Sequence, residues 1–276
     1  MEQIKNATFD AERSLYGLDG AEVSECVFAG PADGESPLKE CRNVDVSGCR
    51  FELRYPFWHD TQCVIRDCTL TESCRAALWY DKMLTMESSE IRGVKAFREC
   101  DVITIASVKA NSEEFGWKCR NVTIDKLDLT SVYPFFECSD MYISDLNMTG
   151  KYSFQYTKNV VIKNSKLKTK DAFWHCKNVT VRDTVIEGEY LGWYSEGLHL
   201  INCTVIGTQP FCYANNLVLE NCRLENCDLA FEKSDVTADV KGTIISIKNP
   251  LSGSITCDGA ELINDTNTSC KINFRK

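Results

Sequence analysis

Apolar residues recur along this chain every 19 residues, inside short segments that alternate apolar and polar positions. Segments such as RNVTIDKLDL, KNVVIKNSKL and KNVTVRDTVI align as copies of one repeat, in which positions 1, 3 and 8 are apolar. An alternation with period two predicts strands and not helices. Position 1 of the successive copies is Ala21, Val44, Cys63, Leu84, Ile103, Val122, Met141, Val160, Val179, Leu198, Leu217, Val236 and Ile255.

Bends are predicted between these strands by the residues at positions 5, 10 and 19. Positions 5 and 19 are rich in Asn, Asp and Ser, and position 10 contains several glycines. These residue types tolerate left-handed backbone or bond to their own backbone. Three strands and three bends per repeat predict an all-β, single-stranded right-handed parallel β-helix of about 12 coils with three sheets, in which equal positions stack. A leucine-rich repeat is the rival fold at this length, but its L-x-x-L-x-L-x-x-N pattern is missing.

We expect one domain over residues 1–276. Residues 1–20 form an N-terminal cap with a short helix at Thr8–Leu15, residues 21–254 form the coils, and residues 255–276 complete the last coil and cap the C-terminal end. Caps are expected because the open ends of a solenoid expose unpaired strand edges.

Composition and charge narrow the possible partners. The net charge of -9 argues against a nucleic-acid partner, which requires a basic surface. No apolar run is long enough for an export signal or a membrane span, so we expect no membrane association and a cytoplasmic location. The sixteen cysteines include no Cys-x-x-Cys pair, and many of them recur at positions 6 and 17 of the repeat. This pattern favours small buried side chains over a metal site, and no motif indicates a cofactor.

Several strings also resemble a known family. RYPFWHD (residues 54–60), CRAALWY (74–80), KYSFQY (151–156) and DAFWH (171–175) resemble a bacterial family of uncharacterised proteins that carries a domain of unknown function. That family is placed with the pectin-lyase-like β-helices. The resemblance covers essentially the whole chain. It implies the β-helix fold and a prokaryotic, cytoplasmic setting, and it implies no established reaction.

The third strand of each coil is rich in aromatic residues. Counted back from the next coil, position 14 is mostly Phe, position 15 is often Trp, and position 16 is polar or aromatic. Because position 17 is small and position 15 shares its parity, we expect the tryptophans inside and a stripe of positions 12, 14 and 16 outside. The expected ligand-binding residues of this stripe are Tyr55, Phe57, Phe97, Tyr133, Phe135, Phe154, Tyr156, Phe173, His175 and Tyr194.

Three interpretations of an outward aromatic stripe compete. It can bind an oligosaccharide or uronate-like ligand, because aromatic rings and a few polar groups suit such a cleft. It can be a protein interface in a non-catalytic scaffold, which includes a homo-oligomer. It can also be extra core, covered by the N-terminal residues, the loop after Gly30 or the C-terminal segment. We favour binding or processing of a carbohydrate-like ligand.

The densest group of chemically active side chains lies in the early coils. The candidate catalytic residues are Arg54, His59, Asp60, Arg75, Tyr80, Asp81, Arg98 and Glu99. Asp81 and Glu99 would serve as an acid–base pair in a glycoside hydrolase, and an arginine beside a carboxylate would suit a polysaccharide lyase. The structural alternative is a charge ladder in which Glu99, Lys118 and Glu137 alternate in sign. Whether the protein is an enzyme therefore stays open, since fold analogy alone favours it.

Overall fold

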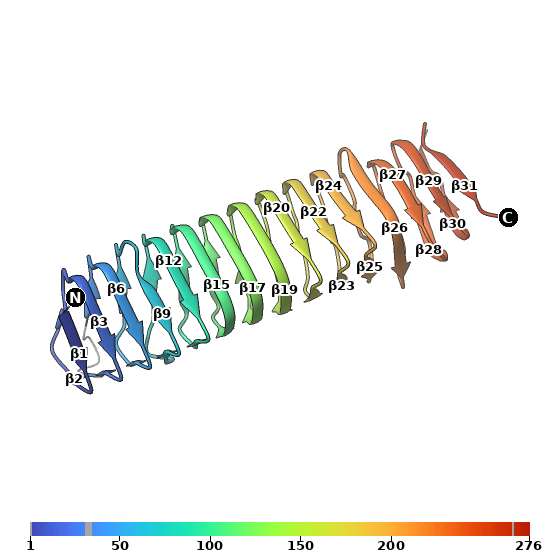
Figure 1. The fold of residues 1–276 in the computed structure, drawn as a ribbon. Helices are drawn as coiled ribbons and strands as arrows, with labels where there is room; N and C mark the ends of the chain where they lie inside the picture. Colours follow the sequence, from blue (N-terminus) through green and yellow to red (C-terminus); the bar gives the residue numbers. More distant parts are fainter. Residues whose placement is uncertain (1, 31–34, 267) are drawn as a thin grey trace. The chain divides into compact units, whose positions relative to one another are not determined.

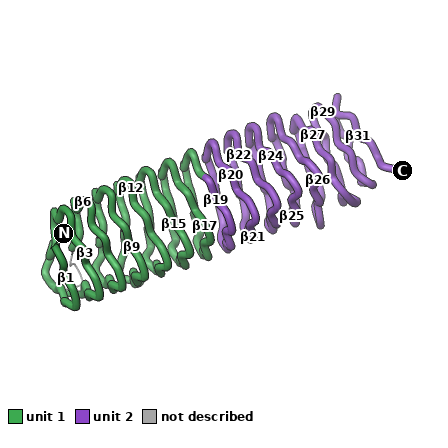
Figure 2. The backbone as a smooth tube through the Cα atoms, viewed as in Figure 1, with its two compact units in different colours: residues 1–141 green, residues 142–276 purple. Residues whose placement is uncertain are grey.

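A computed structural model describes residues 2–30, 35–266 and 268–276, and these residues contain strands and turns without any helix. The chain forms a parallel β-solenoid of about 14 turns with about 19 residues per turn, which confirms the predicted fold class (Figure 1). It divides into two compact units, residues 1–141 and 142–276 (Figure 2). The expectation of a single domain stays a prediction.

Unit 1 stacks strands on three sides of its coils, except that a turn at residues 12–17 forms the third side of the first coil. The third side is a six-stranded parallel sheet of β5 (Leu38–Lys39), β8 (Phe57–Trp58), β11 (Leu78–Trp79), β14 (Lys95–Arg98), β16 (Glu114–Trp117) and β18 (Tyr133–Pro134). The second side contains β2 (Thr8–Phe9), β4 (Val27–Phe28), β7 (Arg50–Phe51), β10 (Thr69–Leu70) and β13 (Glu90–Ile91). The first side contains β1 (Glu2–Lys5), β3 (Asp19–Ser24), β6 (Arg42–Ser47), β9 (Val64–Arg66) and β12 (Lys82–Glu87), and two longer strands continue onto the second side, β15 (Asp101–Asn111) and β17 (Arg120–Ser131).

Unit 2 follows the same plan, but its third side is made of turns at residues 153–156, 172–175 and 191–194. In these three rungs the third side is formed by turns instead of strands. Strand β19 (Ser139–Gly150) contains the point where the units divide. The other strands are β20 (Lys158–Lys163), β21 (Lys166–Lys168), β22 (Lys177–Arg182), β23 (Val185–Glu187), β24 (Glu196–Ile201), β25 (Thr204–Ile206), β26 (Leu217–Glu225), β27 (Asp235–Val240), β28 (Thr243–Lys248), β29 (Ser252–Cys257), β30 (Gly259–Ile263) and β31 (Lys271–Phe274).

Equal repeat positions stack as the 19-residue spacing predicts. Ile103 pairs with Val122 in unit 1, and Val179 pairs with Leu198 in unit 2. The register differs from the prediction near the C-terminus, where Val236 pairs with Gly253 and Ile255 lies beside Ala238. The coil that begins at Val236 is therefore shorter than its predecessors.

The N-terminal segment also differs from the prediction. Residues Glu2–Lys5 pair in parallel with β3, so the first rung begins at residue 2 instead of residue 21. The expected capping helix at Thr8–Leu15 is absent, because Thr8 and Phe9 form β2 and pair with β4. The short strand continues the second side of the solenoid, where Phe9 stacks on Phe28 with ring centroids 5.1 Å apart. Stacking on the next coil thus replaces a separate cap. The loop after Gly30, one of the expected covers of the aromatic stripe, falls at residues 31–34, which lie outside the described residues.

Residues with left-handed backbone form the bends, and the side chain at position 6 forms hydrogen bonds with backbone groups there. Asp67 has a φ of 52°, and the next amide, that of Cys68, points into the coil, where it donates to Ser89 Oγ at 3.0 Å. The Ser89 hydroxyl in turn donates to the Glu87 carbonyl at 2.7 Å. The amide of Cys49 likewise donates to Cys68 Sγ at 3.4 Å. Where position 6 is Cys, Ser or Thr, a small side chain that both accepts and donates therefore satisfies a buried backbone group.

This requirement accounts for the five cysteines at position 6, which are Cys26, Cys49, Cys68, Cys203 and Cys222. All sixteen thiols are free, and fifteen of them are buried, while Cys270 is partly exposed. Burial raises the pKa of Cys74 and Cys176 to about 12. The prediction of small buried side chains is confirmed.

The core of each coil is closed by aromatic and aliphatic side chains. Phe154 and Phe173 stack with ring centroids 5.3 Å apart, and both rings are almost completely buried. In unit 1, Phe115 packs edge-to-face against Phe97 and Phe135. Burial of these rings is a main source of stability for each unit.

Phe154→Ala should lower the free energy of unfolding by about 3–5 kcal/mol, because it leaves a cavity the size of a phenyl ring in the core. Denaturant titration followed by circular dichroism measures the change. Tyr156→Ala is the matched control two residues away. The Tyr156 side chain is 51% exposed, and we expect its removal to cost less than about 1 kcal/mol. Equal effects of the two substitutions would contradict the inward orientation of Phe154.

Thiol reactivity gives a second check on the core. In the native protein at pH 8, a small aromatic disulfide reagent should modify Cys270 and leave the buried thiols unmodified, because burial excludes the reagent and disfavours the thiolate. In denaturant, all sixteen should react. Rapid native reaction of several thiols would contradict the packing.

Candidate functional site

The third side shows an aromatic surface, but different residues form it than the sequence predicts. The phenylalanines of position 14 are buried, and the tryptophans of position 15 are half-buried with one side toward solvent. The prediction that the tryptophans face inward was wrong, and so was the outward placement of the candidate ligand-binding residues Phe57, Phe97, Phe135, Phe154 and Phe173.

Backbone conformation explains this inversion. Phe154 and Tyr156 both have left-handed backbone, with φ of 57° and 56°, and the same holds for Phe173 and His175. A left-handed residue interrupts the alternation of side chains along a strand. Positions 15 and 16 consequently both face outward, between inward positions 14 and 17. The parity argument fails because it assumes an uninterrupted strand.

In unit 1 the outward columns combine tryptophans with one arginine. The Trp58 and Trp79 rings stack with centroids 5.2 Å apart. The Arg98 guanidinium lies 4.7 Å from the centroid of Trp79 and 4.8 Å from that of Trp117, so two indole rings enclose it. Arg98 also donates to Glu114 Oε2 at 2.6 Å.

In unit 2 two parallel columns run along the third side. One column is a continuous stack of Tyr156, His175, Tyr194 and Tyr213, whose successive centroids are 5.0, 5.0 and 4.9 Å apart. The other contains Trp174 and Trp193, with centroids 5.5 Å apart and planes within 1° of parallel. These separations are those of offset stacks, in which part of each ring face stays open.

The indole rings are fixed by hydrogen bonds between rungs. Trp174 Nε1–H donates to the Tyr190 carbonyl at 2.8 Å, and Trp193 Nε1–H donates to the Gln209 carbonyl at 2.8 Å. Where the column lacks a tryptophan, Gln155 Nε2 donates to the Asp171 carbonyl at 3.0 Å in the same way. The tryptophans thus satisfy backbone carbonyls while presenting a ring to solvent, which explains their outward position.

The remaining candidate ligand-binding residues lie at the surface. Tyr156 and Tyr194 are 51% and 44% exposed, Tyr133 is exposed, and His175 is exposed. Tyr55 is half-buried and packs against Trp58 with centroids 5.2 Å apart.

The candidate catalytic residues do not form one site. His59 and Tyr80 stack outside with centroids 4.8 Å apart, and Glu99 is exposed in the next rung. Arg54 and Arg75 lie in adjacent rungs, where the Ala76 amide donates to the Arg54 carbonyl at 3.0 Å. Asp60 and Asp81, however, are 1% and 0% exposed, so these two candidate catalytic residues do not reach the surface. Asp81 lies in the core whereas Glu99 is exposed, so the two carboxyl groups do not open to one common site.

The charge ladder suggested as the structural alternative is partly present. Lys118 Nζ lies 3.6 Å from Glu137 Oε2, and both side chains are about half exposed. Such a surface pair contributes little to stability on its own.

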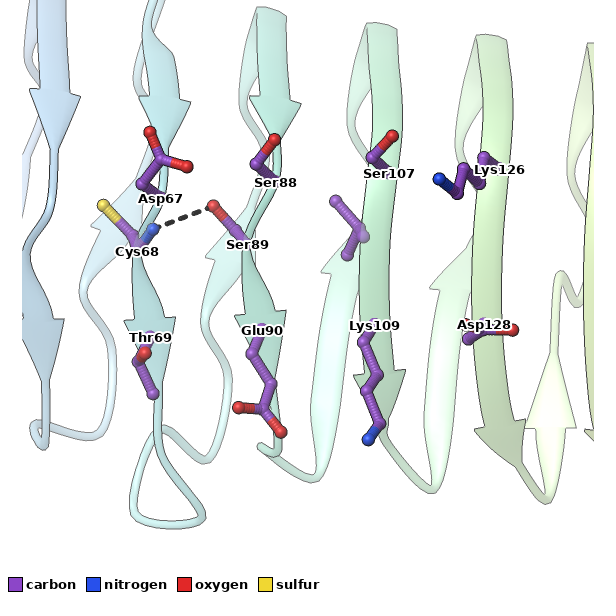
Figure 3. A pocket seen from close by; sticks show the side chains of 11 residues that line it. Asp67, Cys68, Thr69, Ser88, Ser89, Glu90, Ser107, Lys109, Lys126 and Asp128 are labelled. Carbon is purple, nitrogen blue, oxygen red and sulfur yellow. Dashed lines mark hydrogen bonds between the residues drawn. The ribbon is translucent and has the colours of Figure 1, made fainter.

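A polar groove that the sequence reasoning missed follows the position 5 bend of unit 1. It has a volume of about 540 Å³ and runs past Asp67, Ser88, Ser107 and Lys126, which lie in successive rungs (Figure 3). In unit 2 the same position holds Asn and Asp side chains that bond to one another: Asn202 Nδ2 donates to Asp183 Oδ1 at 3.0 Å, and Asn221 Nδ2 donates to Asn202 Oδ1 at 2.6 Å. The short serines of unit 1 leave this space open. The replacement of Asn by Ser at position 5 is the signal that could have identified it.

Within residues 2–30, 35–266 and 268–276, no three His, Cys, Asp or Glu side chains are grouped so that they could hold a metal ion. In the same residues, no helix has the length and hydrophobicity needed to cross a membrane.

Arg98→Ala should destabilise unit 1 by about 1–3 kcal/mol and shift tryptophan emission to longer wavelength, because both indole faces lose a cation and gain water. Fluorescence-detected denaturation measures both effects. Arg120→Ala is the matched control, since the Arg120 ion pair with Asp101 is exposed and should contribute less than about 1 kcal/mol. An unchanged emission spectrum in Arg98→Ala would contradict the enclosed geometry.

Comparison with solved structures finds similar folds at low identity. The A-module of mannuronan C-5 epimerase AlgE4 from Azotobacter vinelandii is 13% identical, with 98% of this chain and 85% of that chain covered and a TM-score of 0.37. The tailspike protein of E. coli bacteriophage HK620 is 10% identical, with 90% and 60% covered and a TM-score of 0.44. The catalytic domain of a GH87 alpha-1,3-glucanase is 10% identical, with 100% and 64% covered and a TM-score of 0.33.

Sequence comparison is more decisive for the family. No curated protein matches the chain. A family model described as a protein of unknown function (DUF3737) matches residues 2–274. This match covers nearly the whole chain and agrees with the resemblance found in the RYPFWHD and KYSFQY strings. The chain therefore belongs to the DUF3737 family, whose function is unknown.

Proposed function

We propose that this protein binds an extended carbohydrate-like ligand on the outer face of the third side. The observation that carries the proposal is the pair of outward aromatic columns in unit 2, the Tyr156–Tyr213 stack and the Trp174–Trp193 stack. Sugar rings have apolar faces that pack against aromatic rings, while their hydroxyls need polar partners nearby. The columns supply both, because the tyrosine and histidine rings of the Tyr156–Tyr213 stack carry phenol hydroxyl and imidazole groups.

The rigidity of the columns supports this binding role. Each ring is fixed by its neighbours in the stack, and each tryptophan is also tied to a backbone carbonyl of the next rung. A ligand would therefore meet a surface that loses little conformational entropy on binding.

Polar groups flank the columns on the side of the preceding bend. Lys170 Nζ lies 3.2 Å from Glu189 Oε2 and 5.3 Å from the centroid of Tyr190. These charges can exchange partners with ligand hydroxyls at the edge of the aromatic surface.

The proposal is for binding, without an assigned reaction. Because Asp81 is buried, the pair with Glu99 does not support glycoside hydrolysis. We further propose a cytoplasmic location, which the free, buried thiols support because disulfides are rare in reducing compartments.

A protein interface on the same face is the second candidate. Exposed tyrosines and tryptophans are also the residues that dominate binding energy at protein interfaces. The exposed rings of Tyr156 and Tyr194 in one column favour this candidate as much as they favour a sugar.

A glycan array followed by tryptophan-fluorescence titration tests the proposal. For any glycan that binds, the double variant Tyr156→Ala/Tyr194→Ala should weaken binding at least about tenfold, because two aromatic contacts of about 1 kcal/mol each are lost. Tyr142→Ala is the matched control, since this tyrosine is 44% exposed but belongs to β19 on the first side.

The contrary outcomes separate the two candidates. An array with no glycan above background would overturn the carbohydrate proposal, as would equal weakening by Tyr142→Ala. A dimer in light scattering that the double variant converts to a monomer would support the interface instead.

A further inference from the structure

Two carboxyl groups lie in the core of unit 1, where the mechanism of ligand binding does not use them. Asp60 and Asp81 are 1% and 0% exposed. Counted back from the next coil, both occupy position 17, which holds Cys41 in the rung before them and Cys100 in the rung after them. Two acids thus interrupt a column of thiols.

The first task of a position 17 side chain is to accept a hydrogen bond from a buried amide. The Cys41 amide donates to Asp60 Oδ1 at 2.7 Å, and the Asp60 amide donates to Asp81 Oδ1 at 2.9 Å. In unit 2 the Ala214 amide donates to the equivalent Ser234 hydroxyl at 2.8 Å. Each amide follows a left-handed residue, such as His59 at a φ of 61°, which turns it into the coil.

The second task is to donate a proton to a backbone carbonyl. Thr157 and Ser195 donate to the position 14 carbonyl of their own rung, at 2.9 and 2.7 Å. Other members of the column, three thiols and Ser234 among them, instead donate to the position 14 carbonyl of the preceding rung. The pairs are Cys41 with Leu15 at 3.3 Å, Cys100 with Leu78 at 3.4 Å, Cys119 with Phe97 at 3.6 Å and Ser234 with Phe211 at 2.5 Å. For Asp60 and Asp81, the equivalent carbonyls are those of Leu38 and Phe57.

An ionised aspartate can perform only the first task. A carboxylate has acceptors and no donor, whereas a protonated carboxyl group accepts with one oxygen and donates with the other. Asp60 Oδ2 and Asp81 Oδ2 are buried without a hydrogen-bond partner. A buried charge with an unpartnered oxygen is far more costly than a neutral acid.

We propose that Asp60 and Asp81 are neutral carboxylic acids in the folded protein, and that their ionisation at higher pH loosens the rungs carrying Trp58 and Trp79. The strands β8 and β11 that hold these tryptophans end two residues before the two acids. The ionisation state of the two acids thereby affects the packing of Trp58 and Trp79 in the outward aromatic column of unit 1. This inference does not depend on the proposed ligand.

The surroundings of the two acids disfavour their charged form. The titratable groups that face them are the thiols of Cys41, Cys63 and Cys100, the Glu40 carboxylate, and each other, none of which is a cation. Burial raises the pKa of both carboxyl groups well above the ordinary value, in agreement with the hydrogen-bond argument.

The sign of the pH dependence follows from this direction. In the unfolded chain an aspartate titrates near a pKa of about 3.9. Because the folded pKa is higher, the neutral acids contribute their full stability below about pH 4, and this contribution falls as the pH rises toward the folded pKa. Acid therefore strengthens this part of the core.

The test compares the wild type with Asp60→Asn/Asp81→Asn over pH 5–9. An amide accepts with Oδ1 and donates with Nδ2, so it reproduces the neutral acid without titrating. We expect the melting temperature of the Asn variant to exceed that of the wild type by a margin that grows with pH. The carboxyl ¹³C shifts of Asp60 and Asp81 in the wild type should report protonated acids at pH 6.

Asp60→Leu/Asp81→Leu is the second variant, because it removes the charge and also the acceptor for the Cys41 amide. It should be less stable than the Asn variant at every pH, as expected for an orphaned buried donor. A margin between wild type and Asn variant that does not change with pH would overturn the proposal. So would ionised carboxyl shifts at pH 6, or a Leu variant as stable as the Asn variant.

Discussion

Each coil of this solenoid must satisfy the backbone groups that its own bends direct inward. A left-handed residue turns the chain at each corner, and the amide that follows it points into a core without water. Such a group needs a partner, because an unpaired buried donor costs about as much as a lost hydrogen bond. The partner must be small enough to fit in the coil, and its own O–H or S–H group must find a hydrogen-bond acceptor. Cysteine, serine and threonine meet both conditions, as Cys68 and Ser89 illustrate.

The same corners determine the outer surface. The left-handed conformation of Phe154 and Phe173 sends two consecutive residues outward after each phenylalanine. One of them, a tryptophan, ties its indole N–H to the next rung, and the other joins the column of Tyr156, His175 and Tyr194. The proposed binding surface and the core are therefore consequences of one backbone geometry. Asp60 and Asp81 are a variant of the same corner, with an acid where a thiol usually lies.

Prediction from the sequence succeeds where a periodic signal is repeated many times. The fold class, the stacking of Val179 on Leu198 and the burial of the thiols all follow from the 19-residue spacing. Prediction fails on the third side because the parity rule assumes extended backbone, and Phe154 and Tyr156 are left-handed. It also names Asp60 and Asp81 as candidate catalytic residues, although their repeat position, which they share with buried cysteines, indicates the core in which both lie.

The sequence by itself determined the solenoid, because thirteen apolar residues at regular spacing favour one stacked arrangement. It also determined which positions are small and which are aromatic. Only the tertiary structure decided which aromatic column faces solvent, and which carboxyl groups are available for chemistry. Those outcomes depend on the sign of φ at single residues and on contacts between rungs. An alternating pattern of apolar and polar residues predicts neither of them.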